Sequence, residues 1–215
     1  MSSKPLMDAR GWEAFMNGVF AIAVTLLVLD IRVPDVGSID SGSALVNALS
    51  AQVPRYAAYV IGFLLLGEYW LSTNRTLDMM RGVDHWFLVV GLVFLMVIAA
   101  VPFATALLAE YIGRDNGRDQ VALVIFVCLQ LCLAILANIL LRYAAHKGRL
   151  MKPAVPASLL RTWLRVAAFG PVIWVVALLA AFFVSGTVTL VLMAVLVIVF
   201  MLDVLTGEPP DGVET

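Results

Sequence analysis

Charged residues are scarce in this chain. Only 13% of its 215 residues are Asp, Glu, Lys or Arg, whereas 62% are hydrophobic, and the mean hydropathy is +0.99. An average soluble domain carries about 25% charged residues. The composition therefore excludes an ordinary soluble protein and predicts an integral membrane protein. Because the net charge is only −1, we expect no nucleic-acid partner.

Cysteine and histidine are almost absent, which excludes several kinds of site. Cys128 and Cys132 lie four residues apart in one apolar segment, a spacing typical of helix packing rather than of a disulfide framework. His85 and His146 lie far apart, and no Cys/His cluster has metal-ligand spacing. The chain also lacks a glycine-rich phosphate loop and a convergent nucleophile, base and orienting group. We therefore expect no metal site, no cofactor and no enzymatic activity.

Long hydrophobic runs are abundant instead. A bilayer core about 30 Å thick needs about 20 apolar residues per helix. Six segments meet that length, so we predict an all-α, multi-pass protein with helices at 13–31, 55–73, 86–110, 120–144, 162–184 and 187–205. Loops with Gly, Pro, Asp and Arg separate them, including the loop at 34–42 and a tight turn at "SGT". We expect 1–215 to form one six-helix transmembrane domain, with a disordered acidic tail at 206–215.

Basic residues predict the orientation of these helices. If both termini are cytoplasmic, ten Lys and Arg residues lie inside and four lie outside, as the positive-inside rule requires. The basic run "HKGRLMK" would then lie against anionic lipid of the inner leaflet. No small-residue cleavage site follows the first apolar run, so we expect that segment to remain in the membrane as a helix.

The first predicted helix carries a chemically distinct stripe. Gly18, Ile22, Thr25 and Leu29 follow spacings of four, three and four residues, and Leu26 lies at the edge of the stripe. Several copies of such a helix around an axis would line a narrow pathway. Alternatively, the stripe packs against other helices, with the Thr25 hydroxyl bonded to the carbonyl four residues earlier. The spacing alone leaves both interpretations open.

Three segments are similar to prokaryotic members of the endosomal and lysosomal potassium channel family, transmembrane protein 175. They are "FMNGVFAIAVTLLVLDIRVP" at 15–34, "GFLLLGEYWLSTNRTL" at 62–77 and "LVFLMVIAAVPFATALLAEY" at 92–111. The third ends in the characteristic pattern Pro-Phe-x-Thr-Ala-Leu-Leu-x-Glu-Tyr. The resemblance implies a homotetramer of six-helix subunits in a bacterial plasma membrane, with the first helix of each subunit around a central pore that passes potassium ions with modest selectivity.

The resemblance also implies roles for the stripe. Ile22, Leu26 and Leu29 are expected to form hydrophobic constrictions, with Ile22 as the gate. Such a constriction closes a pore because a narrow apolar tube cannot replace the hydration of an ion. Thr25 is expected to supply a ring of hydroxyls that favours the more easily dehydrated potassium over sodium.

Polar positions depart from the family pattern. The family motif is Arg-x-x-x-Phe-Ser-Asp, which reads Phe-Met-Asn at 15–17 without the arginine, and the family histidine after Tyr-Trp is replaced by Thr73 and Asn74. An amide keeps two hydrogen-bonding ends and removes a charge. We therefore predict that Asn17 anchors the pore helix through Trp70, Thr73 or Asn74.

Two acidic residues are candidates for vestibule charges. Asp30 would form an acidic ring at the outer entrance, or simply a solvated cap. Glu68 would attract cations to the inner mouth, or pair with Arg10, Arg75 or Arg81. Two amides of the fourth predicted helix are expected to bind neighbouring helices; these are Gln130 and Asn138.

Two other functions remain open at this stage. The altered polar motif is compatible with a structural or regulatory membrane protein that keeps the fold but does not conduct ions. A weak proton leak is the other alternative, although the amides and hydroxyls that replace the acid and the histidine do not titrate.

Overall fold

The computed structural model describes residues 8–35, 37, 39–112, 117–146 and 150–183. Those residues form helices and no β-strand, in agreement with the all-α prediction. The elements are α1 (Ala9–Leu26), the 3-10 helix η1 (Leu27–Asp30), α2 (Gly42–Ser50), α3 (Val53–Asp78), α4 (His85–Tyr111), α5 (Arg118–Ala145) and α6 (Ala157–Phe183).

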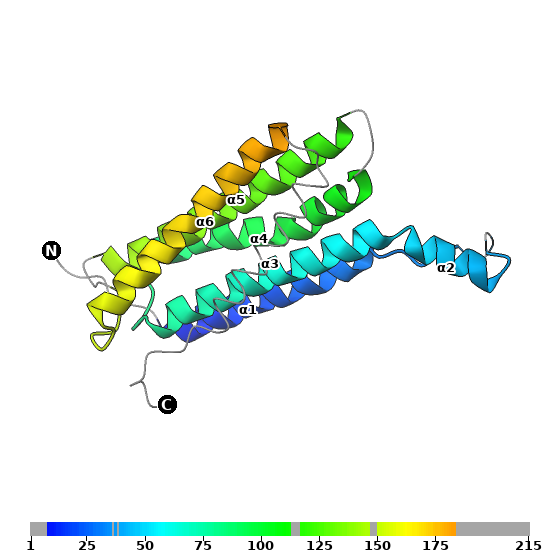
Figure 1. Ribbon diagram of the computed structural model, residues 1–215. Coiled ribbons are helices and arrows are strands. Elements are labelled where there is room, and N and C mark those ends of the chain that lie inside the picture. The colour runs from blue at the N-terminus through cyan, green and yellow to red at the C-terminus, as the bar shows by residue number, and fades with distance from the viewer. Residues whose placement is uncertain (1–7, 36, 38, 113–116, 147–149, 184–215) are drawn as a thin grey trace.

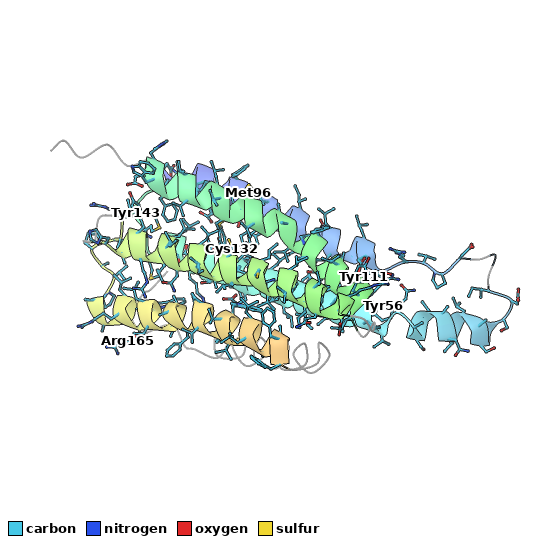
Figure 2. The ribbon with its side chains drawn as sticks, turned by 90° about the horizontal axis from the view of Figure 1, so that it is seen from above. Tyr56, Met96, Tyr111, Cys132, Tyr143 and Arg165 are labelled. Carbon is cyan, nitrogen blue, oxygen red and sulfur yellow. The ribbon has the colours of Figure 1, made fainter. Side chains whose placement is uncertain are left out.

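The long helices lie side by side. In Figure 1, α1 and α3 form the lower pair, α4, α5 and α6 lie above them in the view, and α2 projects from the end of α3. Figure 2 shows α5 between α4 and α6, with Tyr143 and Arg165 near one end of the bundle and Tyr56 and Tyr111 near the other. If the termini are cytoplasmic as predicted, the end with Tyr143 is the inner end.

Four of the described helical segments are long and apolar enough to span a membrane. They are Ala9–Asp30, His85–Tyr111, Arg118–Ala145 and Ala157–Phe183. The segments α2 and α3 qualify as a fifth span only together, with a bend of 48° between them, because Arg55, Glu68, Arg75 and Asp78 dilute the apolar residues of α3. The chain is therefore a multi-pass membrane protein by the length and composition of its helices.

Several boundaries differ from the prediction: α1 begins at Ala9 rather than 13, and α3 ends at Asp78 rather than 73. Residues 42–50, which lie between two predicted spans and belong to neither, form α2, because Ser41 caps the helix by accepting a hydrogen bond from the Ala44 amide at 3.2 Å. α6 begins at Ala157 rather than 162, since its polar first turn lies outside the apolar run that defined the predicted span. The predicted helix at 187–205, the "SGT" turn and the tail at 206–215 lie outside the described residues.

The core lies where α1, α3, α4 and α5 meet. The buried side of α1 consists of Met16, Phe20, Ala23 and, in η1, Leu27. The Phe20 ring lies 6.3 Å from that of Phe94 in α4, which contacts the Tyr69 ring of α3 edge-on at 6.1 Å. These aromatic contacts fix the rotation of α1 about its own axis, and with it the set of residues that α1 turns away from the bundle.

Two helical hairpins are joined by their backbones at the end of the bundle where Tyr143 lies. The Arg81 amide in the α3–α4 loop donates to the Leu150 carbonyl, and the Lys152 amide donates to the Met79 carbonyl, both at 2.8 Å. Met80 and Met151 pair at this point and are buried. The loop between α5 and α6 is therefore attached to the loop between α3 and α4.

A candidate pore-lining face on the first helix

The outward face of α1 carries the residues of the predicted stripe. Ile22, Leu26 and Leu29 expose 62%, 44% and 72% of their surface in the single chain, and Gly18 and Thr25 are exposed beside them. Exposed apolar side chains on a membrane helix face lipid, another subunit or a pathway. Within the part of the chain that the structure describes, the stripe is therefore exposed rather than packed into the core.

Thr25 places a polarised oxygen on that face. Its hydroxyl donates a hydrogen bond to the Ile22 carbonyl at 2.9 Å, three residues earlier rather than the four predicted for ordinary helix packing. Because the single hydroxyl proton is used inside the helix, both lone pairs of the oxygen remain available. The group can therefore accept a donor or coordinate a cation, and it cannot donate outward while this bond is kept.

Beyond Leu26 the helix tightens into η1, whose end is attached to the bundle. The Gln52 side chain accepts a hydrogen bond from the Arg32 amide at 3.0 Å and donates one to the Arg32 carbonyl at 2.7 Å. Sequence analysis missed Gln52 because it precedes a helix and its partner is a backbone segment, which has no residue-type signature. The junction fixes the direction in which the chain leaves α1.

Asn17 contacts one of its three predicted partners. The Trp70 indole Nε1 donates to the Asn17 side-chain oxygen at 2.8 Å, joining α1 to α3. Thr73 and Asn74 instead donate to carbonyls of their own helix, Tyr69 and Trp70 respectively. The contact is neutral and lies near the middle of α1; its role as an anchor remains a prediction.

The acidic candidates lie apart from each other. Asp30 ends η1 and is half-buried, and Glu68 lies on α3 without an ion-pair partner in the described part of the chain. The predicted partner Arg10 forms an ion pair with Asp8 at 3.0 Å, and the Arg75 guanidinium lies 5.7 Å from the Trp163 ring centre. Asp30 directly follows Leu29 of the stripe in η1, whereas Glu68 belongs to another helix, α3.

The two amides of α5 behave differently. Asn138 donates to the Ala167 carbonyl of α6 and accepts from Arg142, so it binds a neighbouring helix as predicted. The fully buried Gln130 has no side-chain hydrogen-bond partner within the described residues, and only its backbone carbonyl accepts a bond, from the Tyr69 hydroxyl at 3.2 Å. The prediction for Gln130 is wrong for the part of the chain that the structure describes.

Comparison with known proteins identifies the family to which this chain belongs. A sequence profile of the family "Endosomal/lysosomal potassium channel TMEM175" matches residues 12–102. A protein of Streptomyces collinus named as a potassium channel is 40% identical over 149 residues, which is 69% of this chain and 70% of that protein. The chain belongs to the TMEM175 family. The matched residues extend from Trp12 to Pro102, so they include all of the α1–α3 contacts described above.

Other TMEM175 proteins extend the comparison. The crystal structure of a lysosomal potassium-selective channel TMEM175 homologue from Chamaesiphon minutus superposes with a TM-score of 0.77, at 33% identity, over 88% of this chain and 94% of that one. The human relative, named an endosomal/lysosomal proton channel, is 31% identical over 71% of this chain but only 31% of its own length. The family thus includes members named for potassium and members named for protons.

Proposed function

We propose that this chain is a potassium-permeable channel subunit, and that the exposed face of α1 lines its pore. The observation that carries the proposal is the exposure of Ile22, Thr25 and Leu29 on one side of a helix whose other side is buried. Relatives named as potassium channels, and a solved homologue described as potassium-selective, support the choice of ion.

Apolar rings would close this pore. Around a symmetry axis, Ile22, Leu26 and Leu29 present rings of branched side chains at successive levels. An ion in such a ring loses its hydration without replacement, and a narrow apolar segment also dewets. Ile22 is the gate in this scheme, because it lies within α1, whereas Leu26 is the last residue of α1 and Leu29 belongs to η1.

Thr25 would supply the polar step between the apolar rings. Its lone pairs face outward while its proton is held by the Ile22 carbonyl, so a ring of these oxygens attracts cations and offers nothing to an anion. Partial replacement of hydration by a few oxygens favours potassium over sodium, because potassium loses its water more easily. The expected selectivity is modest, since one hydroxyl per subunit replaces only part of a hydration shell.

The assembly and placement complete the proposal. Four copies would form a homotetramer in the bacterial plasma membrane, with both termini in the cytoplasm and basic residues such as Lys152, Arg161 and Arg165 near anionic lipid. Asn17 and Trp70 would anchor each pore helix, while Asp30 at the outer entrance and Glu68 near the inner mouth would act as vestibule charges. Crosslinking in mild detergent tests the assembly, and a dimer would rule out a pore built from four α1 helices.

Flux into liposomes tests the proposed function. Purified protein should pass potassium faster than sodium, and Ile22→Asn should raise basal potassium flux by wetting the constriction. Ile139→Asn is the matched control, because Ile139 is an exposed isoleucine of α5, a helix that carries none of the proposed pore-lining residues. Equal flux in both variants and the wild type would place the gate elsewhere.

A non-conducting role is the alternative that one observation favours. The charged groups of the family motif are replaced here by the neutral Asn17–Trp70 contact, which would hold the fold without supporting conduction. No potassium, sodium or proton flux from an intact tetramer would establish this alternative. Proton flux without potassium flux would instead establish a proton leak, which the absence of titratable side chains from Phe15 to Leu29 disfavours.

A further inference from the structure

The segment that follows α1 is held at its outer end by one side chain. After η1, Ile31 turns to an extended conformation, and the Arg32 amide and carbonyl both bond to the Gln52 side chain. Gln52 is 8% exposed, so water competes little for these two bonds. Because the planar Gln52 side-chain amide bonds to both the amide and the carbonyl of Arg32, it fixes the direction of the backbone at Arg32 as well as its position.

Gln52 makes this contact in place of a local one. It occupies the N-cap position of α3, yet its side chain makes no cap hydrogen bond. It lies at the 48° bend between α2 and α3 and reaches a residue twenty positions earlier. Both ends of the amide are therefore used to attach η1 to the start of α3.

The inner end of η1 is held by packing. A Cβ added to Gly62 of α3 would lie 3.2 Å from the Leu27 side chain and 3.2 Å from that of Thr105 in α4. Leu27 and Thr105 are buried, and the Thr105 hydroxyl is bonded to the Val101 carbonyl. Leu27 thus lies in a notch that has no spare room, between two other helices.

Two fixed points determine the direction of the residues between them. Leu27 is held at the start of η1 and Arg32 is held just after its end, so Leu29 has little freedom although its side chain is exposed. A 3-10 helix has poorer hydrogen-bond geometry than an α-helix and is rarely long, which makes the tertiary anchors decisive for this segment.

We propose that Gln52 is a positioning residue for the pore, which fixes the orientation of η1 and thereby the level and width at which Leu29 narrows the pathway. This inference rests on the proposed function. Gln52 touches no ion and lines no pathway; it acts through the Arg32 backbone on Leu29. The selectivity of the channel then depends on a residue outside the pore helix.

The experiment compares Gln52→Met with Gln120→Met in liposomes. Methionine keeps the length of glutamine but forms neither hydrogen bond, and Gln120 is a matched control because its side chain bonds to the Ala181 carbonyl of α6 at 3.3 Å. We expect Gln52→Met to lower the potassium-to-sodium flux ratio toward one, because Leu29 would no longer be held at a single level in the pathway. Gln120→Met should leave the ratio unchanged.

The Leu29→Ala variant tests whether Gln52 affects the flux ratio through Leu29. In Leu29→Ala, Gln52→Met should change the ratio no further, because the side chain that it positions has been removed. A fully additive effect would overturn the inference. If Gln52→Met does not assemble, Gln52→Glu replaces it, since a carboxylate still accepts from the Arg32 amide but cannot donate to its carbonyl.

The outcomes separate this inference from the proposed function. A conducting wild type with an unchanged ratio in the Gln52 variant would overturn the positioning role alone. An equal fall in the ratio for Gln120→Met would also overturn it, as a general loss of stability. A silent wild-type tetramer would overturn the proposed function and, with it, this inference.

Discussion

Gly91 of α4 leaves room for Trp12 at the start of α1, and adding one methyl group there should disturb the contact. In Gly91→Ala the new Cβ would lie 2.4 Å from Cζ2 and 2.8 Å from Cη2 of the Trp12 ring. These separations are too short for non-bonded carbons, so the ring must move. Overpacking of this kind costs about 1–3 kcal/mol, and alanine recovers at most ~1 kcal/mol in helix propensity. We expect a net loss of about 1–2 kcal/mol in unfolding free energy.

Unfolding in mixed detergent micelles measures this loss. Gly170→Ala is the control, because its Cβ would meet only the Ala134 Cβ at an ordinary 3.8 Å, and it should be neutral or slightly stabilising. Combining Gly91→Ala with Trp12→Leu should restore part of the stability lost in the glycine variant, since the smaller side chain leaves room for the methyl. A Gly91→Ala protein as stable as the wild type, or strictly additive effects in the pair, would refute the packing argument.

Three further predictions concern the ends of the helices and their packing. Arg55→Ala removes the ion pair between Arg55 of α3 and Glu110 of α4, whose two side chains are 17% and 32% exposed. The substitution should lower the unfolding free energy by about 1–2 kcal/mol in the same assay. If the losses in Arg55→Ala and Glu110→Ala simply add in the double variant, the ion pair does not contribute as proposed. Hydrogen bonds from the Arg10 backbone amide and, to a smaller extent, from the Arg10 side chain lower the pKa of the Asp8 carboxyl. The contribution of the Asp8 carboxylate to stability is therefore fully present above the ordinary Asp pKa, about 3.9, and is lost as the pH falls through the lowered pKa. Carbon-13 titration should place the midpoint of the Asp8 carboxyl below the ordinary value, and the shift should be smaller in Arg10→Gln. Gly62→Ala, with three contacts of 3.2 Å, should destabilise by about 1 kcal/mol, whereas a gain in stability would mean that the notch can widen.

Hydrophobic length predicted most of the long helices, because a bilayer imposes that length directly on the sequence. The same reasoning could not find α2, since nine residues are too few for a span. It also could not place the change to a 3-10 helix after Leu26, because that change depends on anchors supplied by Gln52 and the notch at Gly62, which are distant in sequence.

The candidate site was partly predictable for a similar reason. An amide in an apolar helix needs a partner, so the sequence indicated a set of partners for Asn17, but only the geometry selects Trp70. Helical spacing predicted that Ile22 and Leu29 share a stripe, but only the structure shows that both side chains are exposed. The predicted Arg partners of Glu68 failed within the described residues because Arg10 has a nearer carboxylate in Asp8, which spacing across helices does not reveal.

The backbone hydrogen bonds between the α3–α4 loop and the α5–α6 loop limit how the molecule can deform. The hairpins α3–α4 and α5–α6 are joined at Arg81 and Lys152. Toward the opposite end, Leu108 of α4 and Leu123 of α5 belong to one buried hydrophobic cluster. The two hairpins are therefore held together at both ends, by main-chain hydrogen bonds at one end and by side-chain packing at the other. The hydrogen bonds between the two loops use main-chain atoms, so they should persist after most side-chain substitutions at Met80 and Met151. Separating the α3–α4 loop from the α5–α6 loop therefore requires both of these main-chain hydrogen bonds to break.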